Sequence, residues 1–299
     1  MVKSMQAQAV PIRRTDEFVN NQLQDLPLSM KYKETEMHFY MDFHSHQGYE
    51  IYFFEEGSGY FLIEDQIYPL EGKDLILISQ NESHKSSPKL DGPSTRSVLH
   101  FLPELLDEPS RDALLEIFRH GLDRRHLRLD AEQLNRYYYL LDRLHEEYTA
   151  RSGDQIMAIR IYMSELLLLL RRYIQNESAH GKEPADRRSI NPKVEQAVKY
   201  ISNHYAEQLT LEKIAQELYL NQYYLCHLFK KTLGITITDF LLQTRIHNAK
   251  RMLMHTNMPI SEVAESVGFN SFSYFGQTFK TFTGATPRSF RKSAQRAGG

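Results

Sequence analysis

One pattern is written twice in the last third of the chain, and this repeat limits the fold more than any other feature. The first copy covers 211–234 and the second covers 260–284. Ile214 corresponds to Val263, 49 residues later, and Phe229 corresponds to Phe279, 50 residues later, so the second turn has one extra residue. Helical patterns alone are common in all-α bundles, but a duplicated one is not. The sequence therefore predicts two copies of one motif, with a simple packed bundle as the alternative.

Each copy predicts a short amphipathic helix, a tight turn and a second amphipathic helix. From Leu211 to Leu218 the apolar residues recur at i, i+3, i+4 and i+7, the spacing of one buried helical face. Two such helices form a helix-turn-helix, whose second helix suits the major groove of DNA. The second helices leave two polar stripes facing outward, formed by Tyr223, Cys226, His227 and Lys230 in the first copy and by Ser273, Gly276, Gln277 and Lys280 in the second.

The segment between the copies predicts a linker helix at about 236–254, between helix-turn-helix 1 at about 211–232 and helix-turn-helix 2 at about 260–282. Such a helix is about 27 Å long at a rise of about 1.5 Å per residue. This length is close to the ~34 Å between successive major-groove faces on one side of DNA. Both second helices are therefore expected to reach adjacent turns of one duplex.

These motifs resemble those of one known family. The stretch from Val194 to Lys292 is similar to the DNA-binding domain of AraC/XylS-type bacterial transcription regulators, which implies a DNA-binding domain over 191–292. Two positions depart from the family pattern: Tyr219 stands in a turn that usually has glycine, and Cys226 replaces a polar base-reading residue. The similarity is carried by Leu211-Glu212-Lys213-Ile214-Ala215, Leu228-Phe229-Lys230-Lys231, Arg245-Ile246-x-x-Ala249-Lys250, Ile260-x-x-Val263-Ala264-x-x-Val267-Gly268-Phe269, Tyr274-Phe275-x-x-x-Phe279-Lys280 and Gly284-x-Thr286-Pro287.

The outward stripes and nearby basic residues predict the DNA contacts. Phosphate contacts position a protein on DNA, whereas base contacts read the sequence. We expect base contacts from Tyr223, Cys226, His227, Ser273 and Gln277. We expect phosphate contacts from Lys230, Lys280, Arg245 and Arg288. The resemblance implies double-stranded promoter DNA and RNA polymerase as partners.

Net charge is divided unevenly along the chain. From Arg187 to Gly299 there are 15 Lys and Arg residues and 7 Asp and Glu residues, a net charge of +8. The whole chain carries −2, so the preceding part carries −10. A basic module joined to an acidic one is the pattern expected when only one domain binds phosphates.

Length and composition fit two globular domains in a reducing compartment. The chain has 299 residues, 41% of them hydrophobic, and a single cysteine, which rules out an internal disulfide framework. Met1 to Val10 lacks an apolar core of signal-peptide length, and no uncharged apolar run is long enough to span a membrane. We therefore expect a cytoplasmic protein without membrane contact, with residues 1–30 as a weakly patterned arm.

Residues 31–102 have the pattern of a small β barrel. Short runs rich in aromatic and β-branched residues, at 50–54, 59–63 and 74–78, are separated by turns such as the one at 71–73. Closely spaced strands with such turns are typical of an antiparallel barrel or jelly roll.

A histidine-rich motif lies inside this predicted barrel. The spacing His44-x-His46-x3-Glu50-x6-Gly57, followed by His84, resembles the two cupin motifs, without the leading glycine of the first and with a degraded second motif. Strand alternation puts His44 and His46 on one face, and Glu50 on it too if the strand continues. Three imidazoles and a carboxylate are a donor set for Zn, Fe, Mn or Ni.

Two interpretations of this barrel site stay open. In the first, a small effector, for which we favour a carbohydrate, is bound by His44, His46, Glu50, His84, Tyr40 and Tyr52. In the second, the three histidines and the glutamate bind a divalent metal, as in a cupin metalloenzyme or a metal sensor. The resemblance favours the sensor without a cofactor, since sensor cupins fused to this DNA-binding domain commonly work without metal. No nucleophile–base pair, phosphate loop or pair of catalytic carboxylates elsewhere indicates an enzyme.

The pattern becomes helical over 103–175. Apolar faces at 129–148 and 154–174, joined by a short polar turn, predict an antiparallel helical hairpin. These faces exceed what one side of a barrel must cover, so we expect a homodimer through this hairpin, as the resemblance also implies; packing within one chain is the alternative. Polar residues 176–190 predict the interdomain linker.

The predicted fold is a two-domain α+β chain. It has an N-terminal antiparallel jelly-roll or cupin barrel with a helical hairpin, and a C-terminal all-α domain with two helix-turn-helix motifs. The predicted function is that of a ligand-responsive transcription regulator, and the resemblance implies an activator. An effector in the barrel regulates DNA binding only if it binds two arrangements of the chain with different affinity.

Overall fold

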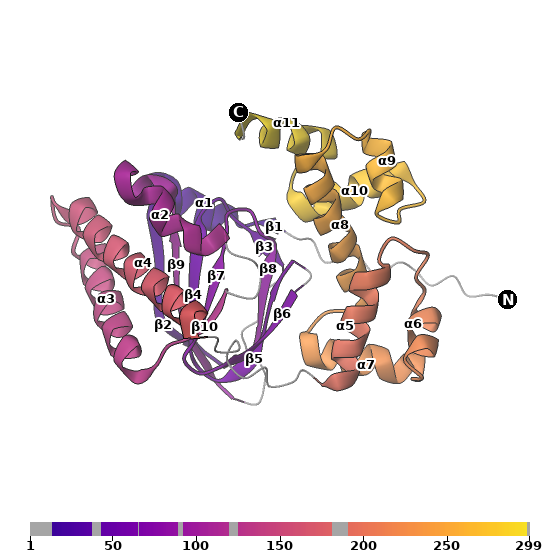
Figure 1. The fold of residues 1–299 in the computed structure, drawn as a ribbon, viewed down its shortest axis with the longest axis horizontal. Helices are drawn as coiled ribbons and strands as arrows, with labels where there is room; N and C mark the ends of the chain where they lie inside the picture. The colour runs from indigo at the N-terminus through magenta and orange to yellow at the C-terminus, as the bar shows by residue number, and fades with distance from the viewer. Residues whose placement is uncertain are drawn as a thin grey trace. The chain divides into compact units, whose positions relative to one another are not determined.

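The chain divides into two compact units. The N-terminal unit contains Asp16–Met41 and Ser45–Arg188, and the C-terminal unit consists mainly of Ser189–Gly299, grouped with the short segments Met1–Thr15 and Asp42–His44. The first combines antiparallel sheets with helices and the second is helical, so the predicted fold class is confirmed (Figure 1). The computed structural model describes residues 14–37, 43–64, 66–88, 92–119, 125–180 and 191–297.

Within the described residues, the β-strands form two five-stranded sheets. The first has the order β1 (Arg14–Thr15), β3 (His44–Ser45), β8 (His84–Pro88), β5 (Ser58–Ile63) and β6 (Gln66–Glu71). The second has the order β10 (His126–Arg128), β7 (Asp74–Ile78), β4 (Tyr49–Glu56), β9 (Ser94–Phe101) and β2 (Leu28–Glu36). In the first sheet β5 pairs antiparallel with β6 and β8, and in the second β4 pairs antiparallel with β7 and β9.

Strand β4 faces two separate apolar clusters, because successive side chains of a strand point to opposite faces. Ile51 and Phe53 belong to a large cluster shared with helices. Tyr52 and Phe54 belong to a second cluster with residues of β5 and β7, between the two sheets. Glu50 has the same parity as Tyr52, so a carboxylate lies at one end of an inner face that is mostly apolar.

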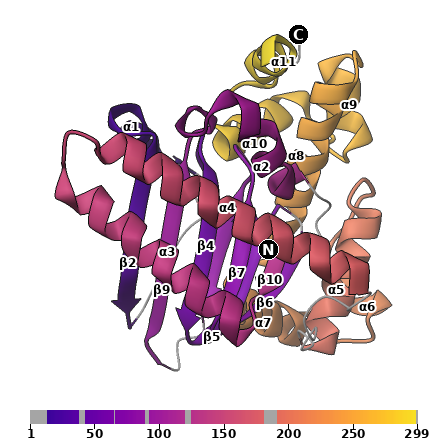
Figure 2. The ribbon, with the colours of Figure 1, turned by 60° about the vertical axis from the view of Figure 1, so that its left-hand side comes forward.

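Helices cover the other face of the second sheet. η1 (Pro103–Leu105), α2 (Glu108–Arg119), α3 (Ala131–Ala150) and α4 (Gln155–His180) follow β9 along the chain. Residues of all four belong to the same apolar cluster as Ile51 and Phe53. Figure 2 shows α3 and α4 packed side by side across this sheet, as the predicted hairpin requires. Within the described ranges, no helix is both long and apolar enough to span a bilayer.

Two elements of the N-terminal unit lie outside the sequence prediction. Helix α1 (Glu17–Asp25) falls within the expected arm, begins at the capping Asp16 and buries Val19 and Leu23. Strand β10 falls within the expected helical connector and pairs with β7, with Leu127 opposite Leu75. Both elements are short, and periodicity over so few residues gives little signal.

The C-terminal unit is built from helices. They are α5 (Pro192–His204), α6 (Leu211–Glu217), α7 (Gln222–Leu233), α8 (Ile237–His255), α9 (Ile260–Ser266), α10 (Phe272–Thr283) and α11 (Pro287–Ala297). The pairs α6–α7 and α9–α10 are the two predicted helix-turn-helix motifs, and α8 connects them (Figure 1). Asn221 caps α7 and Ser271 caps α10, each accepting from backbone N–H groups. Gly234 and Gly284 end the same helices in the left-handed conformation.

Candidate functional site

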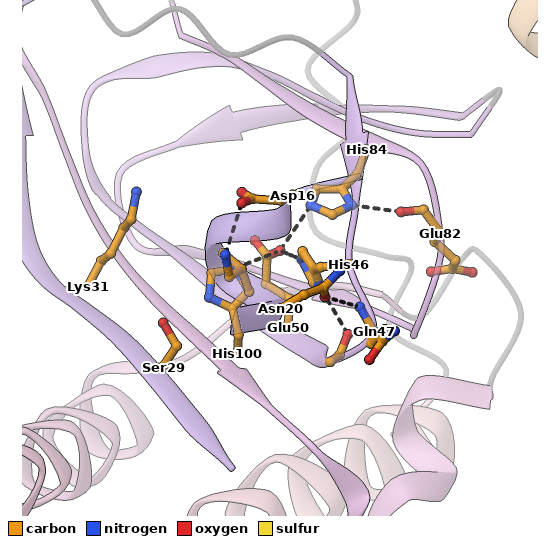
Figure 3. Close-up of polar contacts among 12 residues, drawn as sticks. Asp16, Asn20, Ser29, Lys31, His46, Gln47, Glu50, Glu82, His84 and His100 are labelled. Atoms are coloured by element: carbon orange, nitrogen blue, oxygen red, sulfur yellow. Dashed lines mark hydrogen bonds and ion pairs between the residues drawn. The ribbon is translucent and has the colours of Figure 1, made fainter. Parts of the chain in front are cut away.

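Three imidazoles converge on one carboxylate at the end of the inner sheet face. Oε2 of Glu50 lies 2.7 Å from Nε2 of His46, 3.0 Å from Nε2 of His84 and 3.4 Å from Nε2 of His100. All four side chains are buried (Figure 3). Glu50 is near the start of β4 and pairs across the sheet with His100 of β9, whereas His84 begins β8 of the other sheet. The site therefore joins strand ends of both sheets.

Backbone carbonyls fix the proton positions on two of these histidines. Nδ1 of His46 lies 3.0 Å from the carbonyl oxygen of Gly48, and Nδ1 of His84 lies 2.9 Å from that of Glu82. A carbonyl oxygen only accepts, so each Nδ1 carries a proton. When neutral, both rings therefore turn an Nε2 lone pair toward the Glu50 carboxylate. Such a contact is favourable only when a cation lies between the nitrogen and the carboxylate oxygen, and this cation is either a proton or a metal ion.

Burial and charge have opposite effects on the ionisation of this cluster. Burial opposes the charge on Glu50, but His84 and His100 outweigh it and hold the pKa of Glu50 well below its ordinary value. Burial lowers the pKa of His46, despite its contact with Glu50. Burial also disfavours the charged form of His84, but the Glu50 carboxylate raises the pKa of His84 above its ordinary value. These shifts favour the ionised carboxylate of Glu50 and the neutral form of His46, and they extend the charged form of His84 to higher pH.

The structure brings the predicted motif residues together, although by a different path along the chain. His44 is half-buried on β3, and its ligand atom and those of His46, Glu50 and His84 all lie within 4.8 Å of one another. The condition that one strand continues from His44 to Glu50 is not met, because β3 ends at Ser45 and β4 begins at Tyr49. A turn between the strands directs His46 toward Glu50 instead.

The remaining predicted barrel residues have different outcomes. Tyr52 is buried, and its hydroxyl lies 2.8 Å from Oγ of Ser86. Tyr40 lies outside the described residues. His100 and Ser86 were missed by the sequence motif, because strand pairing brings them there: β9 pairs with β4, and β8 pairs with β5.

Helices α7 and α10 present the predicted base-reading residues on their outer faces. Tyr223 and His227 are exposed on α7, with ring centres 6.5 Å apart and planes inclined by 20°. Ser273 and Gln277 are exposed at the corresponding face of α10. Cys226 is half-buried between the two aromatic residues in sequence, and burial raises the pKa of its thiol, which disfavours a reactive thiolate.

Two protein-family models match the parts of the chain that hold these sites. The AraC-like ligand binding domain matches residues 29–159, and the Helix-turn-helix domain matches residues 214–293. The chain belongs to the AraC/XylS family.

Bacterial regulators are among the relatives of this AraC/XylS-family chain. It is 38% identical to the arabinose operon regulatory protein of Salmonella typhimurium over 143 residues. The aligned region covers 48% of this chain and 48% of that relative. It is 25% identical to the HTH-type transcriptional activator RhaS of Escherichia fergusonii over 250 residues. The aligned region covers 83% of this chain and 87% of that relative. The chain spans about half the length of the first curated relatives it matches. Among solved structures, the C-terminal domain of AraT from Geobacillus stearothermophilus is 36% identical, with a TM-score of 0.34, over 36% of this chain and 88% of that chain.

Basic side chains of this AraC/XylS-family domain differ in what they contact. Lys230, Lys280 and Arg288 are exposed, as a phosphate contact requires. Arg245 is half-buried on α8; its Nε donates to the carbonyl oxygen of Tyr205 and its Nη2 to that of Glu207, both at 2.7 Å. These backbone contacts give Arg245 a structural role, and its phosphate contact stays a prediction.

Proposed function

We propose that this chain is a sequence-specific DNA-binding transcription regulator. The observation that carries the proposal is the exposed polar face on the second helix of both helix-turn-helix motifs. Tyr223, His227, Ser273 and Gln277 offer donors, acceptors and apolar ring edges, the groups that distinguish base pairs in the major groove. Helix α8 has 19 residues and is therefore about 28 Å long, which supports reading of adjacent groove segments by one domain.

Phosphate contacts are the second part of this proposal. We assign them to Lys230, Lys280 and Arg288, which are exposed in a chain segment with a net charge of +8. Neutralised phosphates release counterions, so affinity falls steeply with salt concentration. Binding to promoter DNA, with RNA polymerase as a further partner and activation as the outcome, completes the proposed regulatory role.

We assign the binding of a small effector to the N-terminal unit, near the Glu50 cluster, and we favour a sugar. The support is chemical: Tyr52 lies on the same face of β4 as Glu50, and its buried hydroxyl pairs with that of Ser86 on β8 of the other sheet. The name of the arabinose operon regulatory protein, one of the relatives, supports the sugar class. A sugar regulates DNA binding here only through a difference in its affinity for two arrangements of the chain.

We also propose a homodimer that forms through the α3–α4 hairpin. Most apolar residues of the hairpin are buried within the chain, but Tyr139 of α3 and Met157 and Ile161 of α4 are 61%, 58% and 57% exposed. Met157 and Ile161 are one helical turn apart and so lie on one face. Ile161→Asp is expected to yield monomers in sedimentation experiments; an unchanged sedimentation coefficient of a dimeric wild type would rule out this surface.

Selection of DNA from a random duplex pool tests the proposed function. The full-length chain is expected to enrich one motif, and binding to it is expected to be at least about 10³-fold tighter than to unselected DNA. A pool without an enriched motif after repeated rounds would refute sequence-specific binding. Repeating the selection with a panel of sugars, alongside thermal unfolding of the full-length chain, identifies the effector, because a ligand of the folded state raises its stability.

A second candidate function is binding of a divalent transition metal as the regulatory signal. The specific observation is that His46 and His84 each donate Nδ1–H to a carbonyl oxygen and turn Nε2 toward Glu50. Metal-binding histidines have this arrangement, in which the second ring nitrogen is held by an outer hydrogen bond. Nitrogen donors with one carboxylate fit zinc and its first-row neighbours. His100 adds a donor that the sequence motif lacks.

Equilibrium dialysis against Zn²⁺ or Co²⁺, followed by metal analysis, tests this second candidate. About one ion per wild-type chain is expected, with loss of the ion in Glu50→Gln and His84→Ala. His126→Ala is the matched control, because Nε2 of His126 also lies near a buried carboxylate, 3.1 Å from Asp74, but outside the cluster. A wild-type chain that retains no ion, or an equal loss in the control, would exclude the metal.

A further inference from the structure

The two helix-turn-helix motifs are in contact at a second place besides α8. The loop 205–208 follows α5 in the first half of the domain, and the turn 268–270 joins α9 to α10 in the second half. Nε2 of Gln208 donates to Oδ1 of Asn270 at 2.6 Å, and Nδ2 of Asn270 donates to Oε1 of Gln208 at 2.9 Å. The two amides thus form a reciprocal pair that fixes the loop against the turn.

Gly268 allows the turn to lie directly on that loop. Its φ is +90°, and a Cβ at this position would lie 2.8 Å from the carbonyl oxygens of both Tyr205 and Ala206. Tyr219 occupies the same place in the first helix-turn-helix, with a φ of 53° and a side chain that is 96% exposed. The two copies of the motif therefore differ in their packing, and the turn of the second copy is the one pressed against a neighbouring loop.

Arg245 connects this contact to the linker helix. It projects from α8 and donates to the carbonyl oxygens of Tyr205 and Glu207, which belong to the loop. Its guanidinium carbon also lies 5.7 Å from the centre of the Phe269 ring, which belongs to the turn. Hydrogen bonds from a charged donor are roughly twice as strong as neutral ones. Arg245 thus holds the loop, the turn and α8 in one arrangement.

The three-way contact between 205–208, Arg245 and 268–270 is named the clasp. We infer that the clasp sets the spacing between the two DNA subsites that one domain reads. Without it, the two halves would be joined by α8 alone, and a single helix bends and twists. With it, the distance and rotation between α7 and α10 are fixed. The inference rests on the proposed DNA binding, and it makes Arg245, Gln208 and Asn270 positioning residues that do not touch DNA bases.

The geometry of DNA makes this inference testable. One inserted base pair moves the second subsite by about 3.4 Å and rotates it by about 35° around the helix axis. A domain whose two reading helices are clasped cannot follow this change without losing contacts at one subsite. A domain with a loosened clasp can follow this change in part. The effect of the clasp is therefore measured as the loss of affinity on insertion, not as the affinity for either DNA alone.

The experiment uses the full-length chain and the DNA that the wild type selects, with and without one base pair inserted between the subsites. Wild type is expected to lose at least about tenfold in affinity on insertion. The double variant Gln208→Ala/Asn270→Ala, and separately Arg245→Lys, are expected to lose about threefold or less. Asn257→Ala, an exposed amide before α9, is the matched control and should keep the wild-type loss. Circular dichroism establishes that each variant is folded.

Each outcome decides between the alternatives. Folded variants that bind DNA and keep the full wild-type loss on insertion overturn the clasp, as do variants that lose affinity equally for both DNA lengths, because the contacts then only support the fold. A selected motif with a single subsite overturns the clasp but leaves DNA binding intact. A wild-type chain that selects no motif refutes the DNA-binding proposal, and the clasp with it.

Discussion

Replacing Gly268 with alanine is expected to destabilise the second helix-turn-helix by about 2–5 kcal/mol, the sum of two costs. The φ of +90° strains a residue that has a Cβ, by about 1–2 kcal/mol. The new Cβ would also lie 2.8 Å from the carbonyl oxygens of Tyr205 and Ala206. Both atoms are backbone, and moving packed backbone apart costs about 1–3 kcal/mol.

Tyr219→Gly is the matched control, because it changes the equivalent position of the first copy in the opposite direction. Tyr219 has a φ of 53° and is 96% exposed, so glycine there relieves strain and removes no packing. A gain of up to about 1 kcal/mol is expected.

Hydrogen exchange of α9 and α10 peptides, read by mass spectrometry, measures these changes locally, since a two-unit chain does not unfold in one step. Protection in Gly268→Ala within about 0.5 kcal/mol of wild type would refute the packing argument. So would an equal loss of protection in the first motif of Tyr219→Gly.

Two further predictions concern the DNA-facing helix and the sheet. Gln277→Ala is expected to relax preference at one base position, whereas Lys280→Ala weakens binding similarly for all sequences; an unchanged base-substitution profile for Gln277→Ala would remove its assignment. Burial opposes the charge of Asp74, but hydrogen bonds from His126 and Arg128 hold its pKa below the ordinary 3.8. The resulting stabilisation is present above about pH 4 and is lost as pH falls through the lowered pKa. Asp74→Asn is therefore expected to cost about 1–3 kcal/mol at pH 7 and to flatten the acid side of the urea-unfolding profile; a profile as steep as that of wild type would contradict this.

Local signals explain why the C-terminal unit could be predicted closely. Its helices begin at caps that are visible in the sequence, such as Asn191 before Pro192 and Asn221 before α7, and the repeat gives two independent views of one motif. The role of Arg245 could not be predicted, because its partners Tyr205 and Glu207 are about 40 residues away and are backbone atoms.

Pairing between strands explains what was missed in the N-terminal unit. The spacing of His44, His46 and Glu50 is local, so their grouping was predictable. His100 joins them only because β9 pairs with β4 in a register that sets it opposite Glu50, and this register depends on the whole sheet. Strand β10 was missed for the same reason, since its three residues gain their structure from β7.

Hydroxyl-radical footprinting of the selected DNA with the full-length chain shows whether both helix-turn-helix motifs contact one duplex. We expect two protected segments per domain on one face of the duplex, with centres about 10–10.5 base pairs apart, because α7 and α10 are proposed to enter successive major grooves. The footprint of a Gln277→Ala variant should weaken at only one of the two. A single protected segment, or uniform protection without defined borders, would contradict reading of DNA by both helix-turn-helix motifs.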